Sequence, residues 1–192
     1  MNKNILLSFM IICYLVPIIL VCYNYASNNS VSNIICNNNC KYYILFFMVL
    51  MGIGTLLYEL ERNDIFSQIL ICLLLIGIYG LIYINETYTI HYFFAFTVFI
   101  SILLFMIRHC YLTRYNIILL LSLCLEIMTL FFILTNINKN IFYGEIILIL
   151  NFAFYYLYLH FIPFNLSIAD LYIIILPKAE LLYIKGDLSV TK

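Results

Sequence analysis

Six long apolar runs alternate with short polar stretches along this chain of 192 residues. A helix that crosses a bilayer needs roughly 20 apolar residues, and each run is close to that length. We therefore predict an all-α, polytopic transmembrane six-helix bundle over residues 1–163, with 164–192 as a cytoplasmic tail. The predicted helices cover residues 5–23, 42–58, 65–84, 90–107, 115–135 and 141–162.

The polar stretches predict where these helices end. Residues 24–41 form the longest one, contain seven Asn, and predict a loop or a short irregular segment. Four charges among the six residues 59–64 predict a solvated turn, and 108–114 predicts a basic turn. Because every connection except the first is short, consecutive helices should be antiparallel neighbours.

Two pairs of glycines lie within the predicted helices. Gly52 and Gly54 lie in the second helix, and Gly77 and Gly80 lie in the third. Small residues let helix backbones approach closely inside a membrane. We expect a close helix contact at each pair.

The composition supports a membrane location. The chain is 66% hydrophobic and 9% charged, and its mean hydropathy is +1.09. Ordinary soluble domains have about 45–50% apolar and about 25% charged residues. The formal net charge is zero, which argues against a nucleic-acid partner. We expect membrane lipids as partners. Whether the chain also has protein partners within the membrane is left open by the composition.

Residue usage carries a weaker signal about the source of the chain. Ile, Asn, Tyr, Phe and Lys have AT-rich codons, and their abundance suggests an AT-rich genome, such as that of a parasite or a large DNA virus. Trp is absent. The aromatic residues that normally line membrane interfaces must therefore be tyrosines.

The basic residues predict the orientation, because cytoplasmic loops carry an excess of Lys and Arg. With the N-terminus inside, seven basic residues lie inside and two lie outside, which places both termini in the cytoplasm. The first run resembles a signal peptide, but its length and Pro17 favour an uncleaved helix. The membrane could be an endomembrane, the plasma membrane or a viral envelope. The inner residues are Lys3, Arg62, Arg108, Arg114, Lys178, Lys185 and Lys192, and the outer ones are Lys41 and Lys139.

Cys36 and Cys40 lie in the predicted outer loop. They could form a disulfide in an oxidising compartment and would stay thiols in a reducing one. No second ligand pair accompanies them, so we predict no metal site. His109 and His160 lack acidic or Cys partners at ligand spacing, and we expect both at a membrane interface. No cofactor is predicted.

Glu126 and Asn151 are the most demanding polar residues. Glu126 lies 11 residues into the fifth predicted helix, or about 16 Å along its axis. Asn151 lies at matching depth in the antiparallel sixth helix. We predict a hydrogen bond between them, which acts as a clamp between two helices rather than as a proton relay.

His91 and Glu145 each begin a predicted helix on the outer side. The two side chains could pair with each other or contact lipid headgroups. The alternative is that both are solvated at the interface, with Glu145 also favoured near a helix N-terminus.

Sequence motifs for catalysis are missing. The chain has no Gly-rich phosphate loop, no G-x-S-x-G and no H-E-x-x-H motif. Its Asp residues fall outside the predicted helices, which argues against an intramembrane metal hydrolase. We therefore expect a non-enzymatic protein. The alternative is a transporter or lipid-modifying enzyme that uses Glu126 or His91.

An ordered series of short motifs between about residues 51 and 156 resembles the damage-regulated autophagy modulator (DRAM) family of six-helix membrane proteins, which includes the yeast Sfk proteins. The resemblance implies cytoplasmic termini and a role in lipid organisation, membrane trafficking or autophagy without a defined reaction. Glu145 is followed by Ile146 where the family commonly has Trp, which leaves the subfamily open. A third reading is a viral or parasite membrane protein that binds partners through its Asn-rich loop. The motifs are Gly52-x-Gly54-x-x-x-Tyr58, Arg62, His91-Tyr92-Phe93-Phe94-Ala95-x-x-x-Phe99 and Gly144-Glu145.

Overall fold

The computed structural model describes residues 3–25, 29–37, 41–62, 64–84, 87–135 and 141–161. Its regular structure is entirely α-helical over these residues, as predicted. The helices are α1 (Lys3–Tyr23), α2 (Val31–Asn37), α3 (Lys41–Arg62), α4 (Ile65–Tyr83), α5 (Thr89–Leu112), α6 (Ile117–Thr135) and α7 (Ile141–Phe161). All except α2 are long and apolar enough to cross a membrane. The chain is therefore a multi-pass integral membrane protein.

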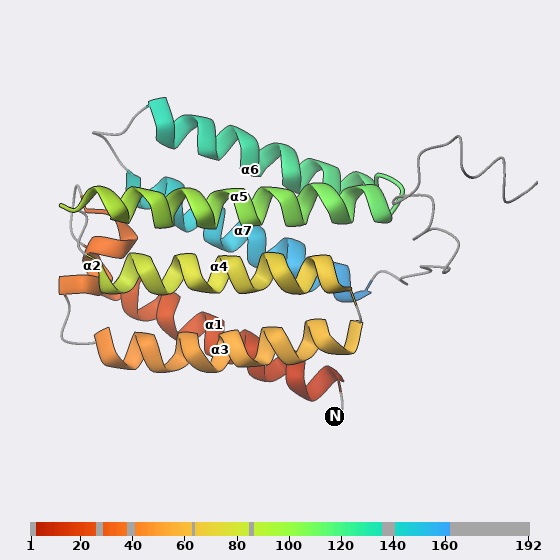
Figure 1. Ribbon diagram of the computed structural model, residues 1–192, viewed down its shortest axis with the longest axis horizontal. Coiled ribbons are helices and arrows are strands. Elements are labelled where there is room, and N and C mark those ends of the chain that lie inside the picture. Colours follow the sequence, from red (N-terminus) through yellow and green to blue (C-terminus); the bar gives the residue numbers. More distant parts are fainter. Residues whose placement is uncertain are drawn as a thin grey trace, which may run out of the picture.

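The six long helices run alongside one another, and α2 lies at one end of the bundle (Figure 1). We call this end the α2 end. Helix α1 begins, and α7 finishes, at the opposite end (Figure 1). The most extensive packing joins α4 to α5, α1 to α3, and α6 to α7. Consecutive long helices are thus antiparallel neighbours, as the short connections predicted.

Two polar turns are shorter than predicted. The residues from Glu59 to Arg62 belong to α3, and the Glu59 side chain is fully buried, so the predicted solvated turn over 59–64 is wrong there. Likewise α5 continues to Leu112 and buries His109. Helical spacing explains the extension at His109, which lies four residues after the buried Phe105 and continues its face.

Helix α2 was not predicted as a helix. It lies within the Asn-rich stretch and buries three apolar side chains, those of Val31, Ile34 and Ile35. Their spacing of three and four residues places them on one face of a helix. This face packs against α1, α3, α4 and α7.

Glycines allow the close packing of α4 on α5. A Cβ atom added at Gly77 would lie 3.2 Å from the carbonyl oxygen of Phe94 and 2.7 Å from Cγ2 of Val98. A Cβ atom at Gly80 would lie 2.2 Å from Cγ of Phe94. The predicted close contact at Gly77 and Gly80 is confirmed.

The predicted tail over 164–192 lies outside the described residues.

Candidate functional site

Polar side chains occur at three levels of the bundle: its middle, the α2 end and the opposite end. At the middle, Asn151 Nδ2 of α7 donates a hydrogen bond to Glu126 Oε2 of α6 at 2.5 Å. Both side chains are buried. The predicted hydrogen bond is therefore confirmed.

Ser122 of α6 holds the Asn151 amide in one orientation. The Ser122 hydroxyl donates to Asn151 Oδ1 at 2.8 Å, and Asn151 Nδ2 donates to the Ser122 carbonyl oxygen at 2.9 Å. A backbone carbonyl can only accept, so the amide nitrogen must point towards it. Asn151 consequently has no hydrogen-bonding group left over, whereas Glu126 Oε1 is buried without a hydrogen-bond partner among the described residues.

The sequence singled out His91 and Glu145, and at the α2 end each of them contacts α2. His91 Nδ1 lies 2.8 Å from the carbonyl oxygen of Ile84, and His91 Nε2 lies 3.4 Å from the Ser32 hydroxyl. Since the carbonyl only accepts, Nδ1 is the donor, and in the neutral ring Nε2 then accepts from Ser32. The Glu145 carboxylate accepts from the backbone N–H of Val31, the first residue of α2. Both side chains therefore hold α2 on the bundle, and their predicted pairing stays a prediction.

Cys36 also lies on α2. Its sulfur atom is 3.0 Å from the carbonyl oxygen of Ile82 in α4. Cys40 lies outside the described residues, so the predicted disulfide is untested. No three His, Cys, Asp or Glu side chains lie together as a metal site within the part of the chain that the structure describes.

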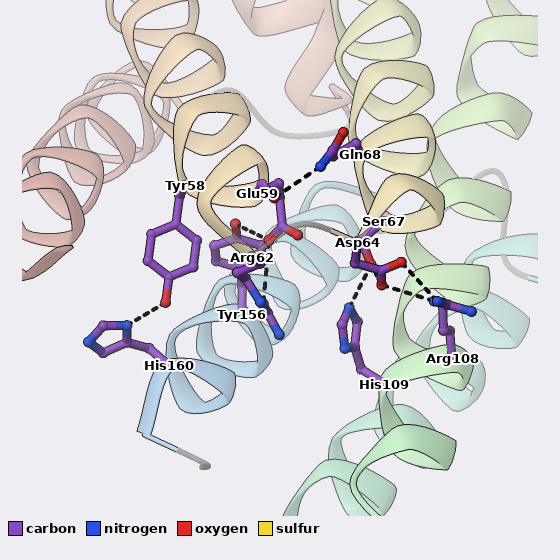
Figure 2. A network of polar contacts seen from close by, with 10 residues as sticks. All are labelled: Tyr58, Glu59, Arg62, Asp64, Ser67, Gln68, Arg108, His109, Tyr156 and His160. Carbon is purple, nitrogen blue, oxygen red and sulfur yellow. Dashed lines mark hydrogen bonds and ion pairs between the residues drawn. The ribbon is translucent and has the colours of Figure 1, made fainter. Parts of the chain in front are cut away.

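The largest polar cluster lies at the opposite end, where α3, α5 and α7 finish and α4 begins (Figure 1 and Figure 2). We call it the helix-end network. Most of its members fell within the two predicted polar turns or at an expected interface, so sequence reasoning did not single it out. Its residues are Tyr58, Glu59, Arg62, Asp64, Ser67, Gln68, Arg108, His109, Tyr156 and His160.

Asp64 joins α4 to α5 in this network. It caps α4 by accepting from the backbone N–H of Phe66, as expected of an Asp at this position. Two nitrogens of Arg108 donate to its two oxygens, at 3.1 and 2.8 Å. Burial raises the pKa of Asp64, but hydrogen bonds from Arg108 and Ser67 and the Arg108 charge outweigh it, so the pKa is below the usual value.

Ser67 lies between Asp64 and the buried His109. Its hydroxyl donates to Asp64 Oδ2 at 2.7 Å and lies 2.9 Å from His109 Nε2. A hydroxyl has one hydrogen, so His109 Nε2 must be the donor to Ser67. In a catalytic triad the order is reversed, because the serine donates to the histidine and the histidine to the aspartate. This Ser-His-Asp set therefore joins α4 to α5 with its hydrogen bonds in the opposite order to that of a catalytic triad.

Glu59 joins α3 to α7. Its Oε1 accepts from the Tyr156 hydroxyl at 2.6 Å and from Arg62 at 3.4 Å. Gln68 of α4 donates to the Glu59 backbone carbonyl at 3.2 Å. Glu59 is fully buried, and its other oxygen, Oε2, has no hydrogen-bond partner among the described residues.

The two histidines of this network have different surroundings. His109 is fully buried, and its ring centre lies 4.3 Å from that of Phe105, so it is shielded from solvent, and its position at a membrane interface stays a prediction. Its helix continues past the polar stretch and turns His109 into the core. His160 is partly exposed, and its Nδ1 shares a hydrogen bond with the Tyr58 hydroxyl.

Comparison with protein-family models, with curated proteins and with solved structures finds no match to this chain. The resemblance to the DRAM family consequently stays a prediction based on short motifs. The geometry describes a multi-pass integral membrane protein whose buried polar side chains bond one helix to another.

Proposed function

We propose that this chain is a non-enzymatic membrane protein of the DRAM-like type, which organises the lipids around it. The direction of the hydrogen bonds within the bundle is the observation that carries this proposal. The Ser67 proton is donated to Asp64 and not to His109. A hydrolytic serine needs the opposite arrangement, so the one Ser-His-Asp set in the described residues favours a structural role.

The α2 end is the part of the bundle that we expect to contact lipid headgroups. His91 and Glu145 both bind α2 there. Exposed tyrosines, such as Tyr83, Tyr88 and Tyr92, surround the same end. Tyr side chains favour the headgroup level of a bilayer. These contacts support a headgroup surface formed by α2 and the neighbouring helix ends.

The test is to identify the lipids that accompany the protein. The full chain is extracted from membranes directly into nanodiscs, and its lipids are quantified by mass spectrometry against empty nanodiscs from the same membranes. We expect one headgroup class to be enriched several-fold around the wild type. His91→Ala should reduce this enrichment because it releases α2.

Thr97→Ala provides a matched control on the same helix, since the Thr97 hydroxyl bonds only to the carbonyl oxygen of Phe93 in its own helix among the contacts described. It should keep the wild-type enrichment. An unenriched wild type would contradict lipid organisation by this protein. New lipid species that accumulate only with the wild type would show an enzyme instead.

A further inference from the structure

We propose that Glu126 is a proton-binding site in the middle of the bundle, with the proton on Oε1 and in exchange with water. This goes beyond the proposed function, for which Glu126 needs only to join α6 to α7. The two carboxyl oxygens of Glu126 have unequal surroundings.

The side of the carboxyl that faces Asn151 can only accept. Asn151 presents an N–H group to Glu126 Oε2, because Ser122 holds the amide in that orientation. A proton on the same carboxyl therefore belongs on Oε1. Oε1 is buried and has no hydrogen-bond partner among the described residues.

No cation balances a negative charge on Glu126 from its own helix or from the helix that it contacts. The segments of α6 and α7 contain no Lys or Arg. A charged carboxyl at this depth is costly unless it is paired or hydrated. Taking up one proton removes the charge without any change in packing.

The titratable and charged groups on the neighbouring helices do not replace a cation. Tyr14 of α1 is close enough to Glu126 for the two groups to interact electrostatically. Its hydroxyl is neutral, however, and donates to the carbonyl oxygen of Ile149. Further such groups on the neighbouring helices are His109 and Arg108 on α5 and Tyr155 and Glu145 on α7. Arg108 is bound to Asp64, and Tyr155 donates to the Met106 carbonyl.

The same geometry distinguishes Glu126 from the other buried carboxyl. Glu59 has the Arg62 guanidinium at 3.4 Å within α3, so a cation lies beside it. Glu126 has an amide as its partner in place of a cation. Proton uptake at Glu126 forms one O–H bond at Oε1 and consumes one hydronium ion from water, and no electron is transferred. Release of the proton requires water to reach Oε1, which is buried between the packed helices. Proton exchange at this site is therefore coupled to helix packing.

Infrared spectroscopy of the full chain in lipid bilayers tests this proposal. A neutral carboxyl has a carbonyl stretch that a carboxylate lacks, and the band shifts when the proton is replaced by deuterium. We expect the wild type to show such a band, Glu126→Gln to lose the intensity of one carboxyl, and D2O to shift the band. Glu59→Gln is the matched control and should keep it.

Two results would overturn the proposal. If the wild type and Glu126→Gln have the same carboxyl bands, Glu126 is ionised. If the band is present but does not shift in D2O, Glu126 is a permanently neutral clamp. Should Glu126→Gln fail to fold, Glu59→Gln with carboxyl-labelled Glu gives the answer, because Glu126 is then the one buried Glu among the described residues, the label must move its band and D2O must shift it. Neither result depends on the lipid enrichment that tests the proposed function.

Discussion

Asp64 combines two roles at the residue scale. Its carboxylate begins α4 by capping the backbone N–H of Phe66, and it balances the charge of Arg108 from α5. The Arg108 guanidinium also lies over the ring of Phe66, 4.7 Å from its centre. Loss of the carboxylate charge would therefore weaken a helix start and a helix–helix contact together.

The pKa of Asp64 predicts an acid-dependent loss of stability. Its folded-state pKa is below the ordinary value of 3.8, so the charged form stabilises the fold at pH values above that value. This contribution is lost as the pH falls through the folded-state pKa. We expect Asp64→Asn to lower the free energy of unfolding by about 1–3 kcal/mol at neutral pH. Unfolding of both proteins in nanodiscs, followed from neutral to acidic pH, measures this.

The two unfolding curves should converge in the acid range, because the wild type then has a neutral Asp64 as well. Glu61→Gln is a suitable control, since Glu61 is an exposed carboxylate close to Asp64 in the sequence. It should keep the wild-type pH dependence. A constant difference between Asp64→Asn and the wild type at every pH would contradict the assigned role of the charge.

Which polar residues could be predicted depends on their surroundings in the sequence. Glu126 and Asn151 are lone polar groups at equal depth in apolar runs, so their contact followed from helix geometry alone. Glu59 and His109 lie beside other charged residues, and local polarity suggested water. Their burial follows a longer repeat, in which Glu59 lies seven residues after the buried Gly52. A buried polar residue and a solvated one in such a stretch are distinguished only by which helix face packs against its neighbours.

At the scale of elements, the helix pairs differ in what sets their separation. Gly77 of α4 faces backbone atoms of α5, because an added Cβ would lie 3.2 Å from both the Phe94 oxygen and the Val98 nitrogen. Gly52 of α3 faces the end of a Leu75 side chain, with Cδ2 at 3.0 Å. A backbone cannot move aside without moving its helix, whereas a leucine can change its rotamer.

We expect Gly77→Ala to destabilise the protein and Gly52→Ala to have little effect. Overpacking at Gly77 should cost about 1–3 kcal/mol. At Gly52, the better helix propensity of Ala, about 1 kcal/mol, offsets the displacement of Leu75. Reversible unfolding in mixed micelles measures both variants. Equal destabilisation by the two substitutions would show that side chains, and not the α5 backbone, set the distance between the helices.

The existence of six helices was predictable because apolar run length alone decides it. Helix α2 was not, because a seven-residue helix has too few apolar positions to stand out from an Asn-rich stretch. Its stability depends on contacts with distant residues, such as the Glu145 carboxylate on its first N–H and the Cys36 contact with Ile82. A short helix held by tertiary contacts leaves little local signal.

At the scale of the whole molecule, the two ends of the bundle differ in their arginines and in their exposed tyrosines. Arg62, Arg108 and Arg114 lie at the opposite end, where α1 also begins and α7 finishes. Exposed tyrosines gather at the α2 end, and two others, Tyr111 and Tyr115, lie at the opposite end. Those of the α2 end are Tyr23, Tyr25, Tyr42, Tyr43, Tyr83, Tyr88, Tyr92 and Tyr143.

This asymmetry predicts that the opposite end, with its arginines, faces the cytoplasm. The native Cys110 cannot report it, because its side chain is only 2% exposed. Tyr88 at the α2 end and Tyr115 at the opposite end are 64% and 61% exposed. Each can be changed to Cys in a chain without other cysteines, which gives two equally accessible reporters on opposite sides of the membrane.

Sealed microsomes expose their cytoplasmic face, so a membrane-impermeant maleimide should label Tyr115→Cys and leave Tyr88→Cys unlabelled until detergent opens the vesicles. The reverse pattern would place α2 in the cytoplasm. Cys36 would then lie in a reducing compartment, and its predicted disulfide with Cys40 would not form. Labelling of both positions in sealed vesicles would mean that the chain inserts in two orientations. The orientation thus decides whether α2, held by His91 and Glu145, meets headgroups of the outer or the cytoplasmic leaflet.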